Sequence, residues 1–144
     1  MKKKIWFDMD GTIANLYGIH NWLDMLLMFD PTPYKQAEPM LNMSAFARLL
    51  HRAQRMGYEI GIISWLSQSS CGNYDKLVTQ AKLEWLQIHL PSVEFNEIKI
   101  VAYGTPKHEI CSGILFDDDE VNRELWGEGA YEPCKILEVL RGLV

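Results

Sequence analysis

The chain has 144 residues, of which 48% are hydrophobic and 23% are charged, and its formal net charge at pH 7 is −5. This length suffices for one domain with a substantial core, and the composition is that of an ordinary soluble globular protein. The acidic balance excludes a general nucleic-acid or membrane surface, which needs clustered positive charge, but it allows a small phosphorylated ligand held by a local cation.

The first part of the chain alternates between strand and helix patterns. Residues 5–8 are predicted to form a short buried strand, and apolar residues at helical spacing predict a helix over residues 20–29. The proline-rich residues 30–43 are expected to be loop, because proline cannot continue a helix. Ser44 is expected to cap the next helix, which should end at Gly57.

The alternation continues to the C-terminus. We expect a strand over residues 58–64, a loop over 67–73 and a long helix over 77–88. Two further strands are expected over residues 93–101 and 114–116. A short helix around Val121 to Trp126 and a last helix opened by Pro133 should follow. The apolar stripe of the long helix is expected to comprise Leu77, Val78, Ala81, Trp85 and Ile88. This order predicts an α/β fold, a three-layer Rossmann-like parallel sheet with helices on both faces.

Residues 14–43 do not fit this regular alternation. A strand-to-helix connection usually takes only a few residues, and this one is far longer. Because it begins just after the first strand, we expect it to form a small helical cap over the end of that strand. The chain is thus predicted to be one domain, residues 1–144, with the cap inserted within it.

The first strand runs directly into two acids, Asp8 and Asp10, followed by Gly11 and Thr12. Two carboxylates at the end of a buried strand repel each other, so a cation or a chemical task must compensate. The position supports this interpretation, because open α/β sheets bind ligands just outside the carboxyl ends of their strands.

Other strands of the predicted sheet also end in polar residues. Ser64 ends the second strand, and Asp117 and Asp118 follow the fourth. Parallel strands place these ends at one edge of the sheet, where several carboxylates favour a hard cation such as Mg²⁺. Lys107 precedes the fourth strand and can add a positive charge, with Lys99 as the less suitable alternative because it lies inside a strand pattern. Acids, Mg²⁺, a hydroxyl and a lysine together suit phosphoryl transfer.

These motifs resemble the haloacid dehalogenase (HAD) superfamily of phosphatases. Residues 8–12 match its DxDGT motif, residues 62–64 its hydrophobic strand ending in Ser or Thr, Lys107 its third motif and residues 116–118 its fourth. The four motifs occur in the family's order and span essentially the whole chain. The acid pair, the compact length and the small insertion look most like the 5′(3′)-deoxyribonucleotidase branch, including its phage and bacterial members.

The resemblance implies a mechanism. Asp8 would attack phosphorus to form an aspartyl-phosphate, and Asp10 would protonate the leaving oxygen and later activate water. Mg²⁺ would be held by Asp8, the Asp10 backbone carbonyl and Asp118, while Ser64 and Lys107 would grip phosphate oxygens. The family pattern favours Asp118 as the metal ligand, but the run of acids leaves Asp117 or Asp119 open; Trp65 is a candidate for contacting the leaving group.

The expected activity is therefore Mg²⁺-dependent hydrolysis of a small phosphomonoester, such as a nucleoside monophosphate. The alternatives are a non-catalytic phospho-ligand-binding protein and a receiver-like signalling domain on the same sheet architecture. Receivers take phosphate on an acid from a middle strand, and no acid follows Ser64 in that role. Phosphatase action on a nucleic-acid end is disfavoured by the acidic balance.

Cysteine usage and the N-terminal pattern bear on the compartment. Cys71, Cys111 and Cys134 are odd in number and widely spaced, which predicts neither disulfides nor a zinc site. The sequence enters a strand pattern at once, so no signal peptide is expected, and no apolar run is long enough for a membrane span. We expect a cytoplasmic enzyme without nucleic-acid or membrane partners; the oligomeric state cannot be inferred from the sequence.

Overall fold

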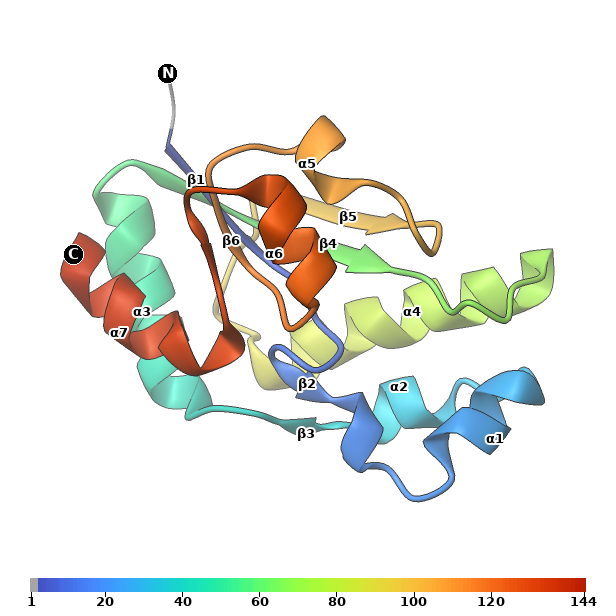
Figure 1. The fold of residues 1–144 in the computed structure, drawn as a ribbon. Coiled ribbons are helices and arrows are strands. Elements are labelled where there is room, and N and C mark those ends of the chain that lie inside the picture. Colours follow the sequence, from blue (N-terminus) through green and yellow to red (C-terminus); the bar gives the residue numbers. More distant parts are fainter. Residues whose placement is uncertain (1–2) are drawn as a thin grey trace.

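The computed structural model describes residues 3–144 and has a central parallel sheet of five strands in the order β5-β4-β1-β6-β7 (Figure 1). The strands are β1 (Lys3–Phe7), β4 (Tyr58–Trp65), β5 (Glu97–Val101), β6 (Ile114–Phe116) and β7 (Ala130–Tyr131). Within residues 3–144, no helix combines the length and the apolar character needed to span a bilayer.

Strand β1 is the middle strand of this sheet. Phe7 is aligned with Ile62 of β4 on one side and with Phe116 of β6 on the other. Ile5, Trp6 and Phe7 are all buried, which explains why β1 is a continuous apolar run rather than an alternating one. The residues that follow β1 therefore emerge at the centre of the sheet's carboxyl edge.

Helices cover both faces of the sheet, as the sequence predicted. On one face, Ile5 and Phe7 pack in a core with residues of α3 (Met43–Arg55), α4 (Gly72–His89) and α7 (Ile136–Leu143). On the other face, Trp6, Ile63 and Leu115 pack against residues near α5 (Lys107–Ile110) and α6 (Glu120–Trp126). The side chains of β1 alternate between these faces, so the expected three-layer α/β fold is confirmed.

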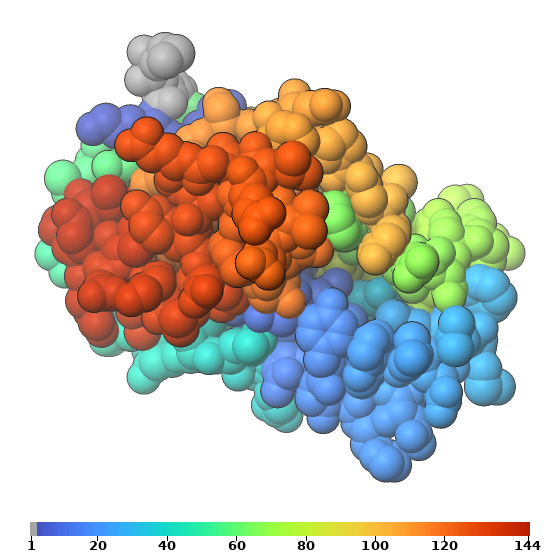
Figure 2. Space-filling view, viewed as in Figure 1, coloured from blue at the N-terminus to red at the C-terminus, as the bar shows by residue number. Residues whose placement is uncertain are grey.

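The insertion after β1 has its own short elements: β2 (Ala14–Asn15), a 3₁₀ turn (Leu16–Gly18), α1 (Trp22–Leu27), α2 (Thr32–Gln36) and β3 (Glu38–Pro39). β2 and β3 pair antiparallel and bring its two ends together. Leu16, Leu26 and Tyr34 form an apolar cluster with residues of α4, which seats the insertion on that helix. The insertion forms a lobe beside the sheet (Figure 1). The molecular surface is hollowed between this lobe and the rest of the domain (Figure 2).

The structure corrects several expected boundaries. The segment 30–43 is not all loop, because α2 lies within it; Pro33 is tolerated in the first turn, and the Asp30 carboxylate accepts hydrogen bonds from the backbone N–H and hydroxyl of Thr32. Asn42, rather than Ser44, caps α3 by accepting from the N–H of Ala45 at 3.0 Å. The turn α5, the two-residue strand β3 and the edge strand β7 were not predicted.

The long helix α4 differs most from its predicted form. It begins at Gly72, and Leu77 and Ile88 of the predicted stripe are 43% and 68% exposed. The buried face consists of Tyr74, Val78, Ala81, Lys82, Trp85 and Leu86. The strand expected over residues 93–101 is also shorter, since β5 begins only at Glu97.

Candidate active site

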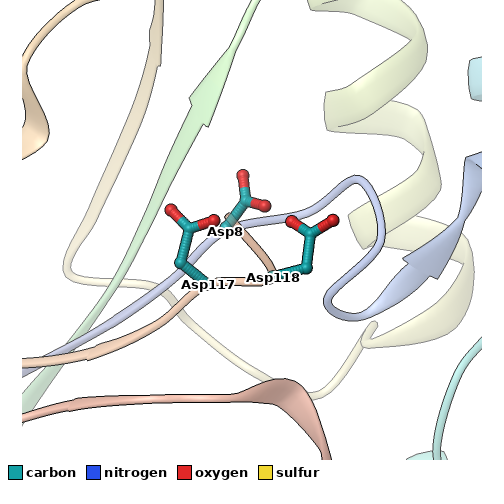
Figure 3. A group of neighbouring side chains, drawn as sticks. All are labelled: Asp8, Asp117 and Asp118. Carbon is teal, nitrogen blue, oxygen red and sulfur yellow. The ribbon is translucent and has the colours of Figure 1, made fainter. Parts of the chain in front are cut away.

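Acidic residues from two neighbouring strands meet at the carboxyl edge of the sheet. Asp8 follows β1, and Asp117 and Asp118 follow β6, which pairs directly with β1. Each contributes a carboxylate oxygen to a group whose members all lie within 4.8 Å of one another. Figure 3 shows the carboxylates of Asp8, Asp117 and Asp118 gathered above the strand ends. Residues more than a hundred positions apart thus form one acidic group, as the parallel topology predicts.

The turn after Asp8 is built to receive Asp118. Gly11 has a φ of +77°, and a methyl group added there would collide with the Asp118 carboxylate and the Tyr17 ring. Thr12 is buried, and its hydroxyl lies 3.0 Å from Asp8 Oδ2 and 3.5 Å from Asp118 Oδ1. The Thr12 hydroxyl oxygen also accepts a hydrogen bond from the backbone N–H of Asp118 at 3.2 Å. Gly11 supplies the space and Thr12 ties the two strand ends together.

The acids after β6 have different partners. Asp117 is buried, and its Oδ2 accepts from Lys107 at 2.7 Å and from the Asn122 amide at 3.2 Å, while its Oδ1 accepts the Asp119 N–H. Asp119 caps α6 by accepting from the Asn122 N–H at 3.1 Å. The carboxylate oxygens of Asp117 therefore accept hydrogen bonds from within the protein, and the carboxylate of Asp119 caps the N-terminus of α6. These contacts leave Asp118 as the acid after β6 best placed to share a cation with Asp8.

In the described part of the chain, one lysine, Lys107, forms ion pairs with this group of three acids. Partial removal from water raises the pKa of Asp118, and the negative charges of Asp8 and Asp117 raise it further. Burial likewise raises the pKa of Asp117, with Asp8 reinforcing the effect and Lys107 opposing it. Carboxylates in such surroundings favour either a bound proton or a cation. Their oxygen donors are those that hard divalent cations prefer, so the group could hold a metal ion.

Lys107 lies between the two strand ends. It is 2% exposed, and its Nζ donates to Asp8 Oδ1 at 3.0 Å and to Asp117 Oδ2 at 2.7 Å. Burial alone would lower the pKa of Lys107, but these two carboxylates together raise it above its usual value. Lys107 is thus held as a cation against Asp8. Lys99, the sequence-based alternative, instead lies on β5 and pairs with Glu97 at 3.4 Å.

The second acid of the first motif has a separate partner. Asp10 Oδ2 accepts from the Nζ of Lys82, a residue of α4, at 2.8 Å. Burial raises the pKa of Asp10, Lys82 opposes that rise, and Asp8 reinforces it. Ser64 is fully buried, and its hydroxyl oxygen accepts from Lys82 at 2.7 Å. Among the described residues that line the pocket, Ser64 is not present, so its expected contact with phosphate stays a prediction.

Sequence reasoning missed Lys82. Val78, Ala81 and Trp85 of the predicted stripe are buried as expected. Leu77 and Ile88, on one edge of that stripe, are exposed, so the prediction turned the buried face away from Lys82. Tyr74, Val78, Ala81 and Trp85 have the spacing of a buried face, and Lys82 is four residues after Val78 on that face. A lysine on the apolar face of a helix was the available signal.

The acids open into a pocket of about 560 Å³ between the sheet edge and the insertion. Asp8, Asp10, Lys107 and Asp118 line its floor. Its walls include aromatic and apolar side chains from both sides: Leu16, Tyr17, Trp22, Leu23, Leu26, Leu27 and Tyr34 from the insertion, and Trp65, Leu66 and Tyr103 from the sheet side. The predicted position of Trp65 beside the site matches this lining.

Two aromatic pairs are prominent in this lining. The rings of Trp65 and Tyr103 have centroids 5.0 Å apart, and Trp65 is further fixed by an indole N–H bond to the Thr105 carbonyl at 2.8 Å. Across the pocket, Tyr17 and Trp22 meet edge to face with centroids 4.8 Å apart. The pocket therefore combines a charged floor with planar apolar walls, which suits a ligand that is anionic at one end and flat at the other.

Comparisons with known proteins show the fold. A scan against models of known protein families found none that matches this sequence, and a search of curated proteins found no match. Among solved structures, the chain is similar to the D,D-heptose 1,7-bisphosphate phosphatase from Burkholderia thailandensis, with a TM-score of 0.58 and 13% identity over 98% of this chain and 97% of that one. Over nearly its whole length, this chain therefore has the same overall fold as that phosphatase.

Proposed function

We propose that the chain is a Mg²⁺-dependent phosphomonoester hydrolase of the HAD type that works through an aspartyl-phosphate on Asp8. The observation that carries this proposal is the meeting of Asp8, Asp10, Lys107 and Asp118 on the floor of one pocket. The likeness of fold to a phosphatase supports it. The order of the sequence motifs along the chain supports it independently.

Asp8 is the nucleophile in this proposal. Lys107 and Thr12 hold its two oxygens at 3.0 Å each, which fixes the carboxylate at the pocket floor. One Asp8 oxygen attacks phosphorus while the bond to the leaving oxygen breaks. Asp8 and Asp118, with the Asp10 backbone carbonyl, would hold Mg²⁺, which would supply positive charge against the phosphoryl oxygens.

Asp10 carries the proton in both halves of the reaction. In the first half it gives its proton to the leaving oxygen, and the alcohol departs. In the second half the Asp10 carboxylate takes a proton from a water molecule, which attacks phosphorus and frees both phosphate and Asp8. Burial raises the pKa of Asp10 above its usual value, which favours the proton that the first half requires, while Lys82 opposes that rise.

The walls of the pocket support a proposal for the substrate class. A nucleoside monophosphate has a phosphate for the floor and a flat base that the rings of Trp65, Tyr103 and Trp22 can contact. A sugar bisphosphate, the substrate in the neighbour's name, has a second phosphate that needs another cation. Among the described lining residues, Lys107 is the single lysine or arginine, and its contacts are with Asp8 and Asp117. Nucleoside monophosphates are therefore the preferred proposal.

A phosphatase assay tests this function. Purified protein is given nucleoside 5′- and 3′-monophosphates, p-nitrophenyl phosphate and a sugar bisphosphate, with Mg²⁺ or with EDTA, and phosphate release is measured. We expect Mg²⁺-dependent release, with the highest kcat/KM for a nucleotide. Asp8→Asn should abolish turnover, whereas the matched change Asp24→Asn on the exposed surface of α1 should not. Mg²⁺ binding without hydrolysis of any substrate would instead indicate a phospho-ligand-binding protein.

A further inference from the structure

Lys82 is a buried lysine to which the proposed reaction assigns no step of its own. It is 1% exposed and lies in the middle of α4, on the helix face that packs against the domain core. Its ammonium donates to Asp10 Oδ2 at 2.8 Å, to Ser64 Oγ at 2.7 Å and to the Trp65 carbonyl at 2.6 Å. A lysine ammonium has three N–H donors, so each has an acceptor.

The surroundings show that Lys82 acts through other residues. It lies behind the pocket wall and is not among the described residues that line the pocket. Its ammonium also lies 5.1 Å from the centre of the Tyr34 ring, which closes its remaining side. With every donor used and no access to the pocket, Lys82 cannot bind substrate. It contacts instead the one acid that the proposed reaction uses to move protons.

The contact with Lys82 makes the two oxygens of the Asp10 carboxylate different. Oδ2 is held by Lys82, and among the described residues no other donor contacts Asp10. The same ammonium holds the end of β4 through Ser64 and Trp65, so Asp10 is fixed relative to the strand beside β1. Asp10 forms an isolated bridge with Ala14 just before the turn, and its side chain is 17% exposed, so Lys82 is the side-chain donor that holds its rotamer in the described part of the chain.

We infer that Lys82 is a positioning residue for Asp10: it clamps Oδ2 so that Oδ1 exchanges the proton with the leaving oxygen. This inference rests on the proposed function, because it assigns Lys82 a part in the same reaction. The inference gives the two lysines of the site different roles. Lys107 holds the nucleophile Asp8, and Lys82 holds the proton carrier Asp10.

Leaving-group dependence tests this role, because a poor leaving group needs its proton and a good one does not. An alkyl phosphate such as glycerol phosphate needs a proton on its leaving oxygen, whereas p-nitrophenolate departs as a stable anion. Lys82→Met should lower kcat/KM for the alkyl phosphate, which reports the first half of the reaction, by roughly 10- to 100-fold, up to the lower end of what general acid catalysis supplies. The loss of kcat/KM with p-nitrophenyl phosphate should be several-fold smaller, whereas kcat can fall for both substrates because Asp10 also serves the second half.

Three further variants complete the experiment. Lys76→Met, an equal change at an exposed position of α4, should leave both rates as in the wild type. Lys82→Gln, which keeps amide N–H donors, is measured in the same way and provides the test should Lys82→Met not fold. In an Asp10→Asn background, Lys82→Met should cause little further loss for the alkyl phosphate, because residues that act as a unit are not additive.

The outcomes separate the two proposals. A wild type with no Mg²⁺-dependent activity toward either substrate overturns the proposed function. An active wild type in which the folded Lys82 variant loses kcat/KM equally for both substrates, or for neither, overturns the positioning role alone. A selective loss with the alkyl phosphate, together with an unaffected Lys76→Met, supports the assignment.

Discussion

Gly11→Ala tests whether the turn after β1 is shaped for Asp118, the proposed metal ligand. A non-glycine residue in the left-handed region costs roughly 1–2 kcal/mol, and Gly11 has a φ of +77°. The added methyl group would also collide with the Asp118 carboxylate and lie 2.9 Å from the Tyr17 ring. The cheapest relief is a rotation of Asp118 away from Asp8, so the variant should fold but hold its cation poorly.

Gly57→Ala is the matched control. Gly57 follows α3 with a φ of +96°, and nothing lies within 4 Å of the methyl group that the substitution adds. Both variants therefore have similar backbone strain, and only Gly11→Ala adds the collision. In EDTA, urea unfolding should show losses of roughly 1–2 kcal/mol for each, with some additional loss for Gly11→Ala.

Added Mg²⁺ should then separate the two variants. At a Mg²⁺ concentration about 100 times its Kd, binding to the folded state contributes about 2.7 kcal/mol to the free energy of unfolding. Displacement of groups around a metal site typically weakens affinity by about 10- to 100-fold, which reduces that contribution to about 1.4 kcal/mol or less. The difference is measured as the Mg²⁺-induced gain in urea midpoint and by calorimetric titration. Equal Mg²⁺ affinity and activity in Gly11→Ala and Gly57→Ala would refute the argument.

Three further predictions concern other contacts of the site. Lys107→Met leaves the buried carboxylates of Asp8 and Asp117 without their ion-pair partner. It should lower the free energy of unfolding in urea by about 3–5 kcal/mol and eliminate turnover. A near-neutral effect on stability would contradict the importance of these ion pairs. Thr12→Val removes the hydroxyl that links the ends of β1 and β6. We expect the free energy of unfolding to fall by about 1–3 kcal/mol and Mg²⁺ affinity, measured by calorimetry, to weaken. Unchanged Mg²⁺ affinity would show that Thr12 does not align the acids. Trp65→Leu should raise KM for a nucleoside monophosphate several-fold more than KM for glycerol phosphate, and an equal change for both would argue against base contact by this wall.

The sequence predicted those parts of the fold that depend on strong periodicity and chain order. Residues 5–8 and 58–64 read as buried strands because they are β-branched or aromatic runs, and parallel topology then required Asp8 and Asp118 to converge. The insertion was recognisable from its length alone. Asp118 was favoured over its neighbours by resemblance, and the internal bonds of Asp117 and the capping bond of Asp119 give that preference a physical basis.

The failures have equally local causes. The prolines in residues 30–43 predicted a loop throughout, whereas Pro33 lies in the first turn of α2, where its missing N–H is not needed. The rotation of α4 was misjudged because Leu77 and Ile88 are apolar yet exposed, and this hid Lys82. Burial of a lysine depends on acceptors from β4 and from the turn after β1, which are distant in sequence. The helical pattern alone does not contain that information.

Trapping of the covalent intermediate tests the central claim most directly. Wild-type protein is mixed with a nucleoside monophosphate and Mg²⁺ and quenched with borohydride, which reduces an aspartyl-phosphate to homoserine, and the modified position is found by peptide mass spectrometry. We predict reduction at Asp8, dependent on both substrate and Mg²⁺, with Asp10 and Asp118 unmodified. Modification at another aspartate, or continued turnover by Asp8→Asn, would contradict the account.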